Sequence, residues 1–164
     1  MKNFFKYFLY VTIYLVIIIF LAVMFIATAK AELIKPNIDI EPFQVVKIQL
    51  KSLKNNDDPK KDSGILQTWE FAHPNNQKYT GPLEKFTTML KGQSYKMLLN
   101  HLDHKIALVN INESMASFEV IILDDNKTYH KFNWQVEKYK KMGPLKDCWL
   151  TTMVSAPVSL GSSI

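Results

Sequence analysis

The first 31 residues have a hydrophobic pattern unlike that of the rest of the chain. From Phe8 to Ala29 there are 22 residues without a charge, and Lys2 and Lys6 precede this run. The run is apolar on every helical face, so it lacks the one-sided pattern of a helix that packs on a soluble core. About 20 apolar residues span a bilayer, so residues 1–31 predict a membrane anchor that contacts lipid through residues 8–29. The preceding lysines place residues 32–164 on the far side of the membrane.

A cleaved signal peptide is the alternative for this segment. The triplets Ala27-Thr28-Ala29 and Ala29-Lys30-Ala31 both fit a small-residue cleavage site. The apolar core of a signal peptide has roughly 7–15 residues, which is shorter than this run, so we favour an uncleaved anchor. We therefore expect residues 32–164 to stay tethered to the membrane, or to be released from it if cleavage occurs.

Apolar residues take helical spacing after a Pro-containing tether at 32–42. Residues 43–54 predict one helix, and "GILQTWEFA" predicts a second that Ser63 caps and that ends at His73-Pro74. A third helix begins near Pro82, with Thr80 or Gly81 as its cap, and "SYKMLLNHL" predicts a short fourth. In the first helix we expect one apolar face, Phe43, Val46, Leu50 and Leu53, with Lys47, Gln49, Lys51 and Lys54 elsewhere.

Between the second and third helices lies "FAHPNNQKYTGPLEKF", from Phe71 to Phe86. Asn75 and Asn76 favour a turn, and Pro82 fits a first helical turn. Turn and cap chemistry thus predict a connector, with Leu83 and Phe86 packed toward Trp69. A binding loop at the rim of a pocket is the alternative.

The second half of the chain alternates with the period of a strand. "KIALVNI", "MASFEVIIL", "TYHKFNWQVEKY" and "CWLTTMV" each predict a strand, and "DDNK" predicts the turn between the second and the third. Helices followed by antiparallel strands indicate an α+β domain over residues 43–158, with helices on one face of a curved sheet of about four strands. We expect residues 159–164 to be a loose tail.

Several of these segments occur together in a specific order. "VVKIQLKSLKNNDDPKKDSGI", "FAHPNNQKYTGPLEKF", "YKMLLNH" and "CWLTTMV" resemble domain of unknown function family 4864, a family of bacterial exported proteins. The resemblance covers about residues 43–158. Together with the leader, it implies a bacterial inner-membrane protein with its C-terminal domain in the periplasm, or a periplasmic protein if cleavage occurs. It implies a nuclear-transport-factor-2-like (cystatin-like) fold, a cone of helices around a bent antiparallel sheet. It implies no reaction, because the family has none assigned.

Charge and cysteine content exclude several classes of protein. All 20 basic residues are Lys, and removing Lys2, Lys6 and Lys30 leaves 17 Lys against 15 acids in residues 32–164. This near balance, without an Arg fork for phosphate or guanine, argues against nucleic-acid binding. Cys148 is the single Cys, so no internal disulfide is expected. Asp57, Asp58 and Asp62 lack the Gly and the closing Glu of a calcium loop.

The residues that could carry chemistry form no recognisable motif. His73, His101, His104 and His130 lack a third zinc ligand in sequence, and the chain has neither a nucleophile motif nor a Gly-rich phosphate loop, so we expect no metal and no cofactor. Folds of the cone class sometimes hold an acid–base pair in an apolar cavity. The conceivable members here are Tyr79, Tyr95, Asp103 and Glu119.

Aromatic residues are the better signal, since most must build the core and a few can line the mouth of the cone. The candidate ligand-binding residues are His73, Asn76, Tyr79, Thr80, Tyr95 and Trp134. We expect a non-enzymatic domain that binds an apolar small molecule or a protein partner. The alternatives are a cavity-type acid–base enzyme (an isomerase or dehydratase) and an accessory subunit of a membrane complex.

Overall fold

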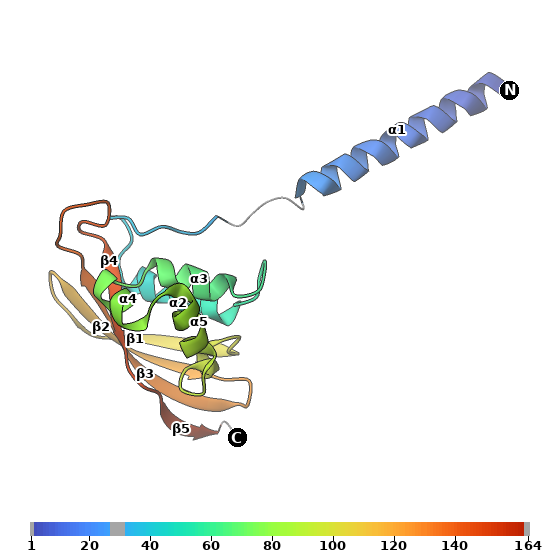
Figure 1. Cartoon of the computed structure of the whole chain (residues 1–164). Helices are drawn as coiled ribbons and strands as arrows, with labels where there is room; N and C mark the ends of the chain where they lie inside the picture. The colour runs from blue at the N-terminus through green and yellow to red at the C-terminus, as the bar shows by residue number, and fades with distance from the viewer. Residues whose placement is uncertain (1, 27–31, 163–164) are drawn as a thin grey trace. The chain divides into compact units, whose positions relative to one another are not determined.

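The computed structural model describes residues 2–26 and 32–162, and the chain forms two compact units, 1–32 and 33–164 (Figure 1). The first unit contains helix α1 (Lys2–Ile26). Within the described residues, no helix is both long enough and apolar enough to cross a membrane. Residues 27–31 lie outside the described residues, and with them the end of the predicted span and both predicted cleavage sites.

The second unit is an α+β domain, as the order of patterns predicts. Its helices precede its strands, and Figure 1 shows them gathered against the sheet. The helices are α2 (Pro42–Lys54), α3 (Ser63–Glu70), α4 (Pro74–Thr80) and α5 (Leu83–Lys91), followed by the 3-10 helix η1 (Lys96–Leu98). The strands are β1 (Asp103–Ile111), β2 (Met115–Leu123), β3 (Thr128–Lys138), β4 (Trp149–Val154) and β5 (Val158–Ser162).

The sheet is antiparallel and has the order β1-β2-β3-β4, with β5 also paired to β3. β4 pairs with residues 134–138 of β3, and β5 pairs with residues 128–131. The last two strands therefore share one side of β3, on either side of an interruption at residues 155–157. The four predicted strands are confirmed, and β5 is a fifth.

Residues of the α3–α4 connection continue this sheet beyond β4. Ala72 forms a parallel bridge with Thr151. The Thr151 amide donates to the Phe71 carbonyl, and the His73 amide donates to the Thr151 carbonyl, both at 2.8 Å. This pairing covers the open edge of β4 and places the start of α4 next to the sheet.

The core lies between the sheet and the helices. Alternate residues of β2 and β3 are buried, as the period-two pattern requires, and they meet the apolar face of α2. This inner set includes Phe118, Val120, Ile122, Phe132, Trp134, Val136, Val46, Leu50 and Leu53, each exposed by 2% or less.

The connector between the second and third predicted helices differs from the expected turn. Residues 74–80 form α4, so Asn75 and Asn76 are helical. Pro74 occupies the first turn, where its missing N–H costs nothing, and Nδ1 of His73 accepts the Asn75 amide at 3.1 Å. This cap offsets the weak helix propensity of the two Asn residues. Pro82 is the N-cap of α5 rather than a residue of its first turn, and Gly81 ends α4.

Four smaller expectations also differ from the structure. The helix predicted over 94–102 is reduced to η1, and Leu102 is 46% exposed. Asp62 rather than Ser63 is the N-cap of α3. Phe43 is 45% exposed and contacts the edge of the Phe118 ring, with centroids 6.2 Å apart. Residues 159–162 of the expected loose tail lie in β5, and residues 163–164 lie outside the described residues.

Candidate functional site

A cavity opens between the helices and the inner face of the sheet. Its volume is about 90 Å³, and on the same measure one water needs about 10–15 Å³. Apolar side chains from α2, α5, η1 and β3 form most of its wall, among them Leu53, Phe86, Leu90 and Trp134. The polar residues in the wall are Gln49, Thr68, Asn76, Thr80, Tyr95 and Thr151. None of the described lining residues is Asp, Glu, Lys, His or Cys.

Gln49 is the centre of the polar part of this wall. Its Oε1 accepts from Thr151 Oγ1 at 2.6 Å and from Trp134 Nε1 at 3.1 Å. Its Nε2 donates to the Thr68 carbonyl at 3.1 Å. Gln49 is 1% exposed, and an unsatisfied amide at that depth would be costly, so these bonds fix its rotamer. The bonds join α2, α3, β3 and β4 behind the cavity.

Helix α4 supplies a second polar group of the wall. The Asn76 side chain donates to the Thr151 carbonyl at 3.4 Å, and Thr80 Oγ1 donates to the Asn76 carbonyl at 2.9 Å. From η1's side of the cavity, the Tyr95 hydroxyl donates to the Val154 carbonyl at 3.4 Å. The Asn76 and Tyr95 contacts are long for hydrogen bonds, and both side chains are half-buried. They can be exchanged for bonds to a ligand at little cost.

The structure brings four of the six candidate binding residues together. Asn76, Thr80, Tyr95 and Trp134 all line the cavity. Tyr79 does not, because it lies on the outer side of α4 and is 84% exposed. His73 lines a separate open groove, with its ring edge-on to Tyr139 and centroids 5.4 Å apart.

Three polar residues of the wall, Gln49, Thr68 and Thr151, are not among the candidates that the sequence suggested. Gln49 was placed on the polar side of its helix, yet it lies three residues after Val46 and four before Leu53, which is the spacing of the buried face. That spacing was a usable signal. Thr151 carried no such signal, because its role depends on which strand lies beside α2.

The residues conceivable for acid–base catalysis are dispersed. Glu119 forms an ion pair with Lys131 at 3.3 Å, and both side chains are at least a third exposed. Asp103 is exposed at the start of β1. Neither residue lines the cavity, where Tyr95 is the one titratable side chain among the described lining residues.

The histidines make pairwise contacts. His101 is 2% exposed, and its Nδ1 lies 2.7 Å from the Leu98 carbonyl, to which it donates. Its Nε2 then accepts from His104 Nδ1 at 2.7 Å. Burial lowers the pKa of His101 to about 4, despite the bond to Leu98. The described residues contain no cluster of three or more metal-ligating side chains.

His130 contacts a carboxylate, with its Nε2 at 2.8 Å from Asp124 Oδ2. Burial raises the pKa of the Asp124 carboxyl, but hydrogen bonds from the Thr128 amide and from His130 outweigh it, so the net pKa lies below the ordinary value. The pair fixes the β2–β3 turn.

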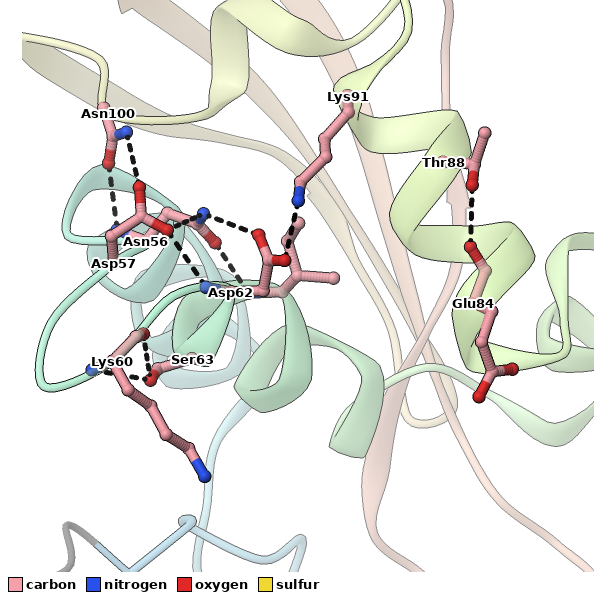
Figure 2. A network of polar contacts seen from close by, with 10 residues as sticks. Asn56, Asp57, Lys60, Asp62, Ser63, Glu84, Thr88, Lys91 and Asn100 are labelled. Carbon is pink, nitrogen blue, oxygen red and sulfur yellow. Dashed lines mark hydrogen bonds and ion pairs between the residues drawn. The ribbon is translucent and has the colours of Figure 1, made fainter.

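Asp57 and Asp62 of the α2–α3 loop belong to a network that holds the loop together (Figure 2). Asn56 donates to Asp57 at 2.9 Å and to Asp62 at 3.3 Å, and Asn100 donates to the other oxygen of Asp57 at 3.3 Å. Lys91 pairs with Asp62 at 2.6 Å. The hydrogen bond from the Asp62 amide, followed by that from Asn100, lowers the pKa of Asp57. The carboxylate oxygens of Asp57 and Asp62 are thus already bonded to donors of the protein itself.

Comparison with known proteins adds no relative to this picture. No family model, no curated protein and no solved structure matches the chain. The resemblance to domain of unknown function family 4864 therefore stays a prediction.

Proposed function

We propose that residues 33–162 form a non-enzymatic binding domain whose ligand is a small uncharged molecule held in the cavity beneath α4 and α5. The observation that carries this proposal is the composition of the wall, which combines apolar side chains with neutral polar groups. Ligand sites of this kind are mostly apolar, with a few polar groups that orient the ligand.

The wall also selects the charge of the ligand. Burying an ionised group without a partner costs several kcal/mol or more. The described lining residues offer no charged side chain to compensate an ionised ligand. A compact phenol or alcohol fits better, since its hydroxyl can bond Asn76, Thr80 or Tyr95 while its body meets Phe86 and Leu90.

The same wall argues against the enzyme alternative. The acid–base pair considered for this fold class joins a carboxylate to a Tyr donor within hydrogen-bond reach of the substrate. The described cavity has Tyr95 but no carboxylate and no His, and Asp103 and Glu119 lie elsewhere.

A pair of matched threonines tests the site. Thr80 and Thr88 each donate from Oγ1 to the carbonyl four residues earlier at 2.9 Å, but only Thr80 lines the cavity. Phenol and benzoate are titrated into the full chain in a nonionic detergent, and binding is followed by the ¹³C-methyl resonance of Met89, a lining residue. We expect saturable binding of phenol, its loss in Thr80→Leu and its retention in Thr88→Leu.

Two results would contradict the binding site. One is the same phenol affinity in the Thr80 and Thr88 variants. The other is benzoate binding as tightly as phenol, which would show that the cavity does not select against charge.

We infer further that the fold is the nuclear-transport-factor-2-like cone that family 4864 implies. Support comes from the helices gathered on one face and from the pairing of β4 and β5 with successive parts of β3, which suits a bent sheet.

The proposed location is the periplasmic side of a bacterial inner membrane, with residues 8–29 as an uncleaved anchor. The sequence alone supports this part of the proposal. N-terminal sequencing of the protein in the membrane fraction tests it, and a mature start at Lys30 or Glu32 would show cleavage instead.

A role as an accessory subunit is the second candidate, and one observation favours it. β1 is an edge strand that pairs with β2 alone among the described strands. Its residues Leu108, Val109 and Ile111 are 53%, 66% and 50% exposed, and exposed apolar edges are typical sites of protein contact. A charged replacement, Val109→Lys, should release a co-purifying subunit and leave phenol binding unchanged.

A further inference from the structure

A second concave site lies at the end of β3, apart from the cavity. It is an open groove of about 460 Å³. Its walls come from three segments: the start of α4 with His73 and Asn75, the β1–β2 turn with Asn112 and Ser114, and residues 137–141. None of its lining residues is shared with the cavity beneath α4 and α5.

The groove carries a local excess of positive charge. Lys138, Lys140 and Lys141 line it, and none of them forms an ion pair with a described residue. Lys138 is held in place by the ring of Trp149, whose centroid is 5.1 Å from Nζ. Glu137 is the one acid among the described lining residues, and its Oε1 accepts from Gln135 at 2.7 Å. Three ammonium groups against one carboxylate leave a net positive charge of two.

Neutral donors complete the groove. Nδ1 of His73 accepts the Asn75 amide, so the proton of the neutral ring is on Nε2, which can donate. Burial lowers the pKa of His73, which keeps the ring neutral at pH 7. Oδ1 of Asn112 accepts the amides of Ser114 and Met115 at 3.0 and 2.9 Å. The NH₂ group of Asn112 therefore keeps its donors for another partner.

We propose that this groove binds a phosphate group, supplied either by a small phosphorylated solute or by the headgroup of an anionic lipid. A phosphate monoester carries about −1.5 to −2 charges at pH 7, which balances the net charge of the groove, and a lipid phosphodiester carries one negative charge, which neutralises part of it. Lysine is a common phosphate ligand that acts as a point charge and needs no fork geometry. The chain has no Arg.

The test compares two pairs of adjacent lysines. Lys140 and Lys141 line the groove, while Lys60 and Lys61 are also exposed and lie in the α2–α3 loop. The double variants Lys140→Gln/Lys141→Gln and Lys60→Gln/Lys61→Gln change the net charge by the same amount. Inorganic phosphate is titrated calorimetrically into the full chain in a nonionic detergent at constant ionic strength. In a second arm, the micelles contain phosphatidylglycerol.

We expect saturable binding in at least one arm and a loss of affinity of about tenfold or more in the Lys140/Lys141 variant. The Lys60/Lys61 variant should bind within about twofold of the parent chain, as expected for distant charges that are screened by salt. Binding of inorganic phosphate identifies a solute as the source, and binding confined to phosphatidylglycerol micelles identifies the headgroup. Absence of binding in both arms, or equal losses in the two variants, overturns the proposal. The cavity shares no lining residue with the groove, so both lysine variants should bind phenol like the parent chain. Failure of the phosphate proposal would therefore leave the phenol site untouched.

Discussion

Replacing Gln49 with Leu should destabilise the domain more than the same change at an exposed Gln. Leu removes the acceptor of Thr151 Oγ1 and the donor to the Thr68 carbonyl. Two bonds remain after the change: Trp134 Nε1 lies 3.3 Å from Thr151 Oγ1, and the Phe71 amide lies 3.3 Å from the Thr68 carbonyl. Gln49 has three buried partners, Thr151 Oγ1, Trp134 Nε1 and the Thr68 carbonyl. Because of the two remaining bonds, the substitution leaves one or two of these groups without a partner, rather than all three.

The magnitude follows from those groups. Each unsatisfied buried polar group costs about 1–3 kcal/mol, and the apolar Leu side chain recovers part of this, so we expect a net loss of roughly 2–4 kcal/mol. For a domain of about 130 residues, each kcal/mol lowers the melting temperature by about 3–5 °C. The expected decrease is therefore roughly 6–20 °C.

Tryptophan fluorescence is the suitable assay, because all three Trp residues (Trp69, Trp134 and Trp149) lie in the second unit. Gln93→Leu is the matched control, since Gln93 is exposed in the turn after α5, and it should shift the melting temperature by less than about 2 °C. The variants Gln49→Leu and Thr151→Val should also be non-additive when combined, because they break the same bond. Equal melting temperatures for the Gln49 and Gln93 variants would refute this account of the cavity wall.

Three further predictions concern the packing and charge of the same domain. Phe86→Ala should cost about 3–5 kcal/mol of unfolding free energy, because Phe86 is 6% exposed. His73→Ala should cost less than about 2 kcal/mol, the upper range for a lost helix cap. Chemical denaturation measures both losses, and similar values for the two variants would contradict this contrast. Gly64→Ala should prevent normal packing of α3 on α2, since its Cβ would lie 2.0 Å from the Ser52 carbonyl oxygen; a melting temperature like that of the parent chain would show that the helices can separate freely. The pKa of His101 is lowered to about 4 in the folded state. Its contribution to stability is therefore complete above its unfolded pKa of about 6.5 and is lost as the pH falls toward 4. Denaturation curves should show the unfolding free energy decreasing with falling pH over this range in the parent chain, and decreasing less steeply in His101→Gln.

The fold could be predicted from sequence wherever one periodicity dominated. The alternation at Phe132, Trp134 and Val136 identified β3 because a half-buried strand demands it. The connector after Phe71 was harder, because Asn75 and Asn76 favour turns in isolation, and the cap from His73 makes them helical. β5 was missed since its five residues are all exposed and have no buried face to reveal it.

The candidate site was predictable in part for the same reason. Asn76 and Thr80 could be nominated as polar groups of a loop at the rim of a pocket, and Tyr95 and Trp134 as aromatic residues that line its mouth. Thr151 could not, because its place beside Gln49 depends on a pairing between residues 102 positions apart. Tyr79 was misplaced because the direction of a side chain on α4 follows from where that helix begins.

The pairing of residues 71–73 with β4 also sets the order in which the domain can be completed during synthesis. The hairpins β1–β2 and β2–β3 join neighbours in sequence, and such contacts form early. The contacts of Ala72 and Gln49 with Thr151 cannot form until β4, the fourth of the five strands, has been synthesised. A nascent chain that stops before β4 therefore lacks one wall of the cavity and leaves the polar atoms of Gln49 and Trp134 without their shared partner. The binding site comes into existence only when β4 has been made and has reached residues synthesised long before it.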